Sequence, residues 1–144
     1  MKRWLWILIC GIMLNVVAVA DDGIAIVKSV EGSVSVKRTH ETLPLKARDR
    51  LFKNDIIMTG EKSSVGLIFH DGSVLSLGEK SYLRIDEFIF KPSEQQFKFK
   101  LSMDKGSALF ESGKIGTLAP EAFELKIPEG TVGIRGTKFL VEVK

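Results

Sequence analysis

The stretch Glu129–Phe139, EGTVGIRGTKF, has a glycine at every third position, at Gly130, Gly133 and Gly136. Glycine-rich runs can cradle phosphate groups, because their backbone amides approach the ligand closely. Such a loop follows a strand and opens a helix, whose N-terminus meets the phosphate. Here Val141-Glu142-Val143 continues the stretch as a strand-like run. The sequence therefore predicts no phosphate site, and we expect no cofactor.

The other residues that could do chemistry are few and scattered. Asp71-Gly72-Ser73 could supply an acid or a metal ligand, but it also fits a tight turn, which we favour. His40 and His70 have no Cys or Glu partners at metal-ligand spacing, so we expect them at the surface or in turns. No nucleophile elbow is present. We expect no catalytic residue, no metal site and no enzyme activity.

Residues 1–20 have the layout of a secretory signal peptide. A charged start, Met1-Lys2-Arg3, precedes an apolar run and the small-residue pattern Ala18-Val19-Ala20. We expect cleavage after Ala20 and a single domain, residues 21–144, in the periplasm. The alternative is an uncleaved membrane anchor, but the apolar run contains Asn15 and is shorter than the roughly 20 residues of a typical span.

Removing that segment changes the composition. Lys2 and Arg3 are its only charged residues, so residues 21–144 hold 19 basic and 18 acidic residues. A nearly neutral chain without a basic block is not expected to bind nucleic acid. The single cysteine, Cys10, also lies in the segment, together with Trp4 and Trp6. The remaining chain can therefore form no internal disulfide, and it has no tryptophan for stacking on a sugar.

The elements that must position these residues are strands. Apolar side chains alternate with polar ones in four runs, which indicates half-buried strands. We expect an all-β fold: a single compact domain of about ten short strands, a β-sandwich or an irregular β-solenoid-like roll, after an N-terminal signal helix. The best candidate for a helical turn is Pro120 to Phe123. The four alternating runs are Val65–Phe69, Phe97–Met103, Phe123–Ile127 and, less regularly, Phe139–Val143.

One turn pattern recurs four times: a charged residue, glycine, a hydroxyl residue and an apolar residue. Glycine readily takes the positive φ that tight turns require, and Ser or Thr can bond nearby backbone groups. The spacing is too uneven for a solenoid repeat, so we interpret the pattern as turn chemistry before strands. The four copies begin at Glu31, Asp71, Lys105 and Glu129.

Two segments together resemble the FecR-type domain. The run Asn54–Asp86 resembles its Gly-Asp-x-Ile-x-Thr-Gly, Asp-Gly-Ser core, and Ile127–Val143 resembles its closing pattern Pro-x-Gly-x-x-Gly-x-Arg-Gly-Thr-x-Phe. Asn54 replaces the first glycine, and Asn tolerates the left-handed conformation next best. The matching residues are Asp55, Ile57, Thr59, Gly60, Ser64, Asp71, Gly72, Ser73, Leu75, Leu77, Pro128, Gly130, Gly133, Arg135, Gly136, Thr137 and Phe139.

The resemblance implies an all-β periplasmic module. In the named family members, this module relays the state of an outer-membrane receptor to a cytoplasmic sigma factor. We expect neither a cytoplasmic region before the signal segment nor a further C-terminal domain, and so we do not expect that role here. We expect a non-catalytic binding or signalling module whose partner is an envelope protein. The alternatives are a cell-wall or polysaccharide binder and a structural envelope component. Membrane contact is expected only through an uncleaved signal segment.

We expect the motif residues to hold the fold together rather than to perform chemistry. For the closing motif, a ligand notch is the alternative to glycines that admit a close strand crossing or a bulge. Arg135 is expected to pair with a carboxylate or a carbonyl. The predicted structural residues are Asp55, Thr59, Gly60, Asp71, Gly72, Ser73, Gly130, Gly133, Arg135, Gly136 and Thr137.

Lysines gather around one strand. Lys98 and Lys100 alternate with apolar residues, and Lys91 and Lys105 lie nearby in the sequence. We interpret them as a solvated strand face. A weak contact with an acidic partner or an anionic glycan is the functional alternative.

Overall fold

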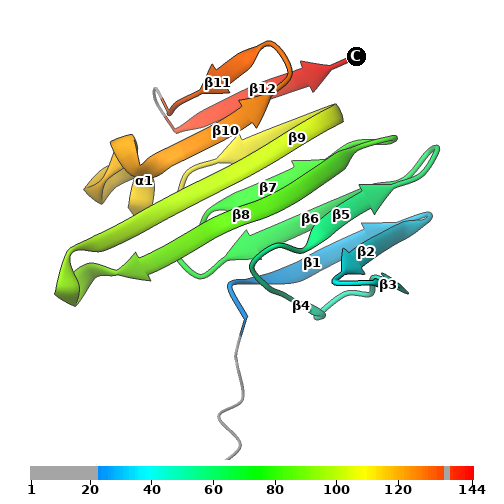
Figure 1. Cartoon of the computed structure of the whole chain (residues 1–144), viewed down its shortest axis with the longest axis horizontal. Helices are drawn as coiled ribbons and strands as arrows, with labels where there is room; N and C mark the ends of the chain where they lie inside the picture. The colour runs from blue at the N-terminus through cyan, green and yellow to red at the C-terminus, as the bar shows by residue number, and fades with distance from the viewer. Residues whose placement is uncertain (1–22, 135–136) are drawn as a thin grey trace, which may run out of the picture.

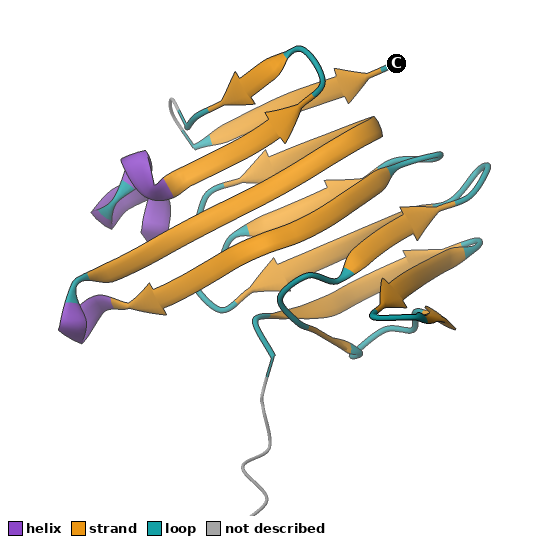
Figure 2. Cartoon of the chain, viewed as in Figure 1, coloured by secondary structure: helices purple, strands orange, loops and turns teal. Residues whose placement is uncertain are grey.

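The structure is a computed structural model that describes residues 23–134 and 137–144. The expected signal segment, residues 1–20, lies outside the described residues, as do Arg135 and Gly136. Strands dominate the described chain, and helices are confined to short turns (Figure 2). The expected all-β class is confirmed, with twelve strands joined in one curled sheet.

The described chain consists of twelve strands and three short helical segments, which lie between some of the strands (Figure 1). The strands are β1 (Ala25–Glu31), β2 (Val34–Arg38), β3 (Glu41–Pro44), β4 (Arg50–Leu51), β5 (Ile56–Thr59), β6 (Ser64–Phe69), β7 (Val74–Leu77), β8 (Tyr82–Lys91), β9 (Gln96–Glu111), β10 (Phe123–Ile127), β11 (Gly130–Val132) and β12 (Lys138–Val143). The helical segments are η1 (Pro92–Glu94), α1 (Lys114–Leu118) and η2 (Pro120–Ala122).

The long strand β9 connects two halves of the sheet. Its N-terminal part lies between β8 and β10, and the first half of the sheet has the order β3-β2-β5-β8-β9-β10-β11. Its C-terminal part lies between β7 and β12, and the second half has the order β12-β9-β7-β6-β1-β4. All pairs are antiparallel except β9–β10, which is parallel. Strand β9 is therefore part of both halves and joins them into one sheet.

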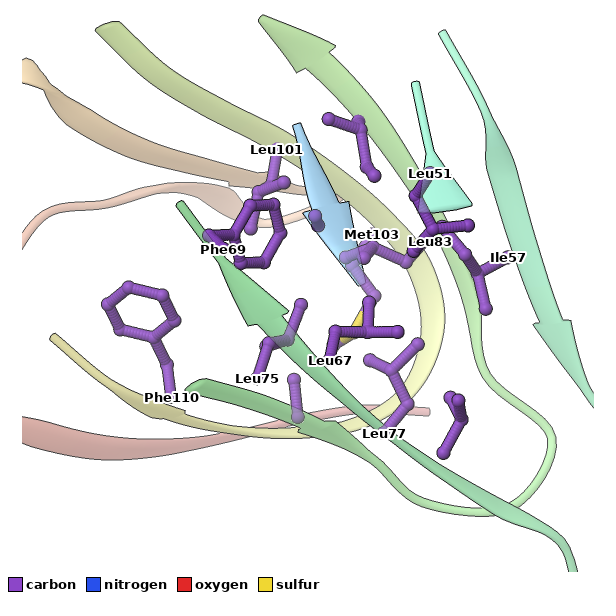
Figure 3. Close-up of a cluster of buried hydrophobic side chains, with 14 of the residues drawn as sticks. Leu51, Ile57, Leu67, Phe69, Leu75, Leu77, Leu83, Leu101, Met103 and Phe110 are labelled. Atoms are coloured by element: carbon purple, nitrogen blue, oxygen red, sulfur yellow. The ribbon is translucent and has the colours of Figure 1, made fainter. Parts of the chain in front are cut away.

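The core is a single cluster that both halves line. Alternation along β6 turns Val65, Leu67 and Phe69 inward, and all three are fully buried. Figure 3 shows apolar side chains from several strands packed together, with Phe69 and Phe110 toward one side of the cluster. Phe99 has no exposed surface. The centroid of its ring lies 4.6 Å from that of Phe69 and 5.2 Å from that of Phe123.

The expected strands are confirmed where the sequence alternates, and one turn prediction is wrong. All four copies of the turn pattern place glycine at positive φ, between 73° and 152°. The copy at Lys105, however, is no turn, because β9 continues through it to Glu111. Gly106 (φ 103°) instead follows a bulge, where the pairing of β9 with β8 shifts between Tyr82 and Leu83. This bend lets one strand pass from the first half of the sheet to the second.

The expected helical turn at Pro120 is present as η2. The preceding helix α1 was not expected, since Lys114–Leu118 has no helical periodicity. Five residues cannot hold a helix by propensity alone, so tertiary contacts must stabilise α1.

Candidate functional site

Asp55 is a buried carboxylate with a full set of internal partners. It is 1% exposed and accepts two hydrogen bonds from Arg38, with Nε 2.9 Å from Oδ1 and Nη2 2.8 Å from Oδ2. The amide of Phe52 donates a third at 2.8 Å, and the Arg38 guanidinium lies 4.7 Å above the Phe52 ring. The hydrogen bond that Arg38 donates to Asp55 raises the pKa of Arg38 above its ordinary value. These contacts stabilise the β4–β5 connection. Both carboxylate oxygens of Asp55 are bonded to protein groups and shielded from solvent.

Asn54, next to it, has φ 70°, so the expected left-handed conformation is confirmed. Its amide donates to the carbonyl of Ile85 at 2.7 Å, which ties the turn to β8. Asparagine thus takes the place of the family glycine without losing the backbone geometry.

Thr59 and Gly60 fasten the opposite end of β5. The Thr59 hydroxyl donates to the carbonyl of Gly78 at 2.6 Å and accepts from the amide of Ser81 at 2.8 Å. Gly60 donates to the carbonyl of Ser33 at 2.9 Å. These bonds join the end of β5 to the start of β2 and to the β7–β8 turn.

Asp71 and Ser73 form the expected turn and also anchor α1. Asp71 Oδ1 accepts from the amide of Ser73 at 3.0 Å, and Oδ2 accepts from the Ser73 hydroxyl at 2.7 Å. The amide of Ile115, in the first turn of α1, donates to the same carboxylate at 3.2 Å. The Ser73 hydroxyl accepts from the amide of Gly113 at 2.8 Å. A carboxylate at the start of a helix satisfies its free amides, which explains why α1 forms there.

In the described part of the closing motif, the glycines are not where two strands approach each other closely. A Cβ added to Gly130 or Gly133 would meet no atom within 4 Å, so the close strand crossing expected there is not present. Thr137 is exposed and continues into β12. The close approach lies instead at Gly113, where a Cβ would meet the backbone of Asp71 and Ser73.

This contrast gives a stability prediction. Gly113→Ala should lower the free energy of unfolding by about 2 kcal/mol, because its methyl group must displace the backbone of the Asp71 turn. Gly133→Ala is the matched control and should stay within roughly 0.5 kcal/mol of the wild type. Urea unfolding measures both. Equal losses in the two variants would show that the packing around Gly113 is not a constraint.

The histidines and lysines lie at the surface. His40 and His70 are both exposed and occupy separate turns, after β2 and after β6. Lys98 and Lys100 approach the same carboxylate, Glu87, at 3.8 and 3.9 Å. The basic face is therefore partly neutralised within its own half of the sheet. Within residues 23–134 and 137–144, no group of three or more His, Cys, Asp or Glu residues could hold a metal ion.

An open groove of about 620 Å³ lies beside the β10–β11 hairpin. Arg84 and Lys126 line it together with Asp104 and Glu129, so its charges are mixed. Asp86 is held by Arg84 and by the Ser102 hydroxyl, which lines the groove.

The outer face of the second half of the sheet carries several exposed apolar side chains. Ile26 lies opposite Ile68, Ile68 lies opposite Val74, and Leu109 lies opposite Leu140. Ser76, two residues after Val74 on β7, lies opposite Leu109, so all five apolar side chains share one side of neighbouring strands. Four of the five are exposed large apolar residues, and Val74 is half-buried. We call these five residues the apolar face. Contiguous exposed apolar patches can mark interaction sites, which makes this face a candidate for one.

Sequence reasoning missed this face, although the signal was present. In Val65–Phe69 the alternation puts an apolar residue, Ile68, at a position that should be polar. In Phe139–Val143 the imperfect alternation comes from Leu140, which is 71% exposed. Arg38 was also missed, since nothing in the sequence pairs it with Asp55.

The fold and the surface define the class: an all-β module in which, among the described residues, every buried side-chain nitrogen and oxygen bonds to another protein group. The family model described as FecR protein matches residues 55–144, more than half of the chain, so the chain belongs to the FecR family. The match begins at the buried Asp55 and includes the closing motif. This family is one of signalling and regulatory proteins of the cell envelope, which act with other envelope proteins.

Comparisons with curated proteins and with solved structures found no match. Within residues 23–134 and 137–144, no helix is long and apolar enough to cross a membrane.

Proposed function

We propose that this FecR-family protein is exported by residues 1–20 and acts as a non-catalytic module that binds another protein of the cell envelope. The observation that carries the proposal is the apolar face. It lies on the outer face of the second half of the sheet, whereas Lys98 and Lys100 point outward from β9 in the first half.

The buried polar side chains support a non-catalytic role. Asp55, Thr59, Asp71, Ser73 and Ser81 all bond to other protein groups. Among the described residues, every buried side-chain nitrogen and oxygen has a hydrogen-bond partner. A catalytic group needs an atom that is free to reach the substrate, so these residues are better explained as residues that stabilise turns.

A protein partner fits this surface better than a glycan. Sugar sites of the stacking type need large aromatic faces. Across residues 23–134 and 137–144, every aromatic side chain is buried or half-buried, and most pack around Phe99 and Phe110. The apolar face consists of aliphatic side chains, which suit a protein surface of similar character.

In-cell photo-cross-linking tests the proposal. A photoreactive phenylalanine analogue is placed at position 68 on the apolar face or, as the matched control, at position 100 on the charged face. We expect position 68 to give a discrete adduct with one other protein in the envelope fraction, and position 100 to give none. An absence of adducts at position 68, or equal adducts at both positions, would contradict the proposal.

A further inference from the structure

Four strands bound the sheet in the described part of the chain, and β12 is unlike the other three. Each of β3, β4, β11 and β12 pairs with a single neighbour there. β3 contains Pro44, β4 has two residues, and β11 has three including Gly130. β12 has six residues without proline or glycine, and its register with β9 is unbroken. Proteins usually protect edge strands with short length, proline, bulges or charged side chains, and of these β12 has only the charges of Lys138 and Glu142.

The backbone groups on the open side of β12 can be assigned. The amide of Ser112 donates to the carbonyl of Thr137 at 2.8 Å, which extends the β9–β12 ladder by one pair. Hydrogen-bonded and non-bonded pairs alternate along an antiparallel ladder. Residues 139, 141 and 143 therefore bond to β9. The N–H and C=O groups of Lys138, Leu140 and Glu142 point to the open edge.

The other side of β9 gives the same assignment. The amide of Gly78 donates to the carbonyl of Ser107 at 2.9 Å, in register with the β7–β9 ladder. Residues 107, 109 and 111 of β9 therefore bond to β7, which leaves the residues between them to bond to β12. Two independent hydrogen bonds thus place the unpaired groups of β12 on its open side.

The side chains of β12 form a self-complementary series. Leu140 lies at the centre of the outer face with Lys138 on one side and Glu142 on the other. On the inner face, Phe139 and Val141 pack against the core but stay only partly buried at the open edge. A strand that paired with β12 would cover these two residues as well as Leu140.

We propose that a second copy of this chain pairs with β12 in antiparallel orientation, with Leu140 opposite the partner's Leu140. This register places Lys138 opposite the partner's Glu142, and the twofold symmetry repeats that pair. The outward N–H and C=O groups of each protomer then meet the same groups of its partner. On the inner face, Phe139 lies opposite the partner's Val141.

The charges select this register over its neighbours. A shift that sets Lys138 opposite the partner's Lys138, or Glu142 opposite the partner's Glu142, opposes like charges. The intermediate shifts set a charged residue opposite Leu140. Among the registers that cover Leu140, only the one centred on Leu140 forms two opposite-charge pairs across the edge, so the proposed pairing is specific.

Self-association goes beyond the proposed function, since it needs no other protein. It would join the apolar faces of the two protomers, because Leu109 lies opposite Leu140 in each chain. An interface of six residues per strand is small, so we expect a dissociation constant in the micromolar range or weaker.

Sedimentation equilibrium of the purified protein tests the pairing. Loading concentrations from about 5 µM to 500 µM cover the dissociation constant expected for so small an interface. We expect the mean mass to rise from one chain toward two. Leu140→Lys should weaken association at least tenfold, because two ammonium groups then meet at the twofold axis. Leu118→Lys, at an exposed apolar residue away from this edge, is the matched control and should associate as the wild type does.

A charge exchange tests the register. Lys138→Glu and Glu142→Lys should each weaken association at least tenfold, and the double variant should regain most of it. Urea unfolding checks that each variant is folded. A single-chain mass at all concentrations would overturn the proposal, and so would a double variant that stays as weak as the single ones. Pairing of this edge with an extended peptide from another protein, while the chain itself stays monomeric, would also overturn it.

Discussion

Phe99→Ala should be the most destabilising single substitution in this protein, with an expected loss of about 4 kcal/mol in the free energy of unfolding. Phe99 is fully buried, and its ring contacts Phe69 from the second half of the sheet and Phe88 and Phe123 from the first. Removing the ring leaves a cavity between the two halves, which β9 prevents from collapsing because it is bonded on both sides. Urea unfolding followed by circular dichroism measures the loss.

Two substitutions control for this effect. Phe99→Leu keeps most of the volume and should cost less than half as much. Phe97→Ala, two residues away on the same face of β9 but only half-buried, should also cost less. If Phe97→Ala destabilises the protein as much as Phe99→Ala does, the core is not centred where the two halves meet.

Arg38→Ala should give the second large loss, about 3 kcal/mol, because it leaves the buried carboxylate of Asp55 without its counter-ion. Arg38 is about one-third exposed, which lets water reach the site and keeps the loss near the lower end for such pairs. Arg38→Lys should recover only part of the stability, since a lysine cannot supply the two-pronged contact. Urea unfolding again provides the measurement.

Lys37→Ala is the control, because Lys37 is the exposed neighbour of Arg38 on β2. It should stay within roughly 0.5 kcal/mol of the wild type. The double variant Arg38→Ala, Asp55→Ala should lose less than the sum of the two single variants, since each removes the same interaction. Strict additivity would show that the two residues do not act as a pair.

The fold class could be predicted because it depends on local patterns. Alternation located β6, β10, β12 and the first part of β9, since a half-buried strand must place apolar residues on one side. The order of the strands could not be predicted, because alternation is the same whichever neighbour a strand has. The parallel pairing of β9 with β10 is the clearest case.

The roles of the motif residues needed the folded structure for a similar reason. Asp71-Gly72-Ser73 indicated a turn, but its contact with Ile115 joins residues 44 positions apart. The Arg38–Asp55 pair joins residues 17 positions apart, one on β2 and the other in the β4–β5 connection. Such partners leave no periodic trace in the sequence. The apolar face did leave one, in the apolar residues that interrupt the alternation of β6 and β12.

The most direct test of the account is the amount of complex that a chain with Ile68→Lys forms with the envelope protein captured by cross-linking. The account predicts at least a tenfold loss of complex, while the free energy of unfolding stays within about 1 kcal/mol of the wild type, because Ile68 points outward. Lys100→Ile, on the charged face, should bind as the wild type does. Unchanged binding by a folded Ile68→Lys chain would contradict the claim that this protein works through its apolar face.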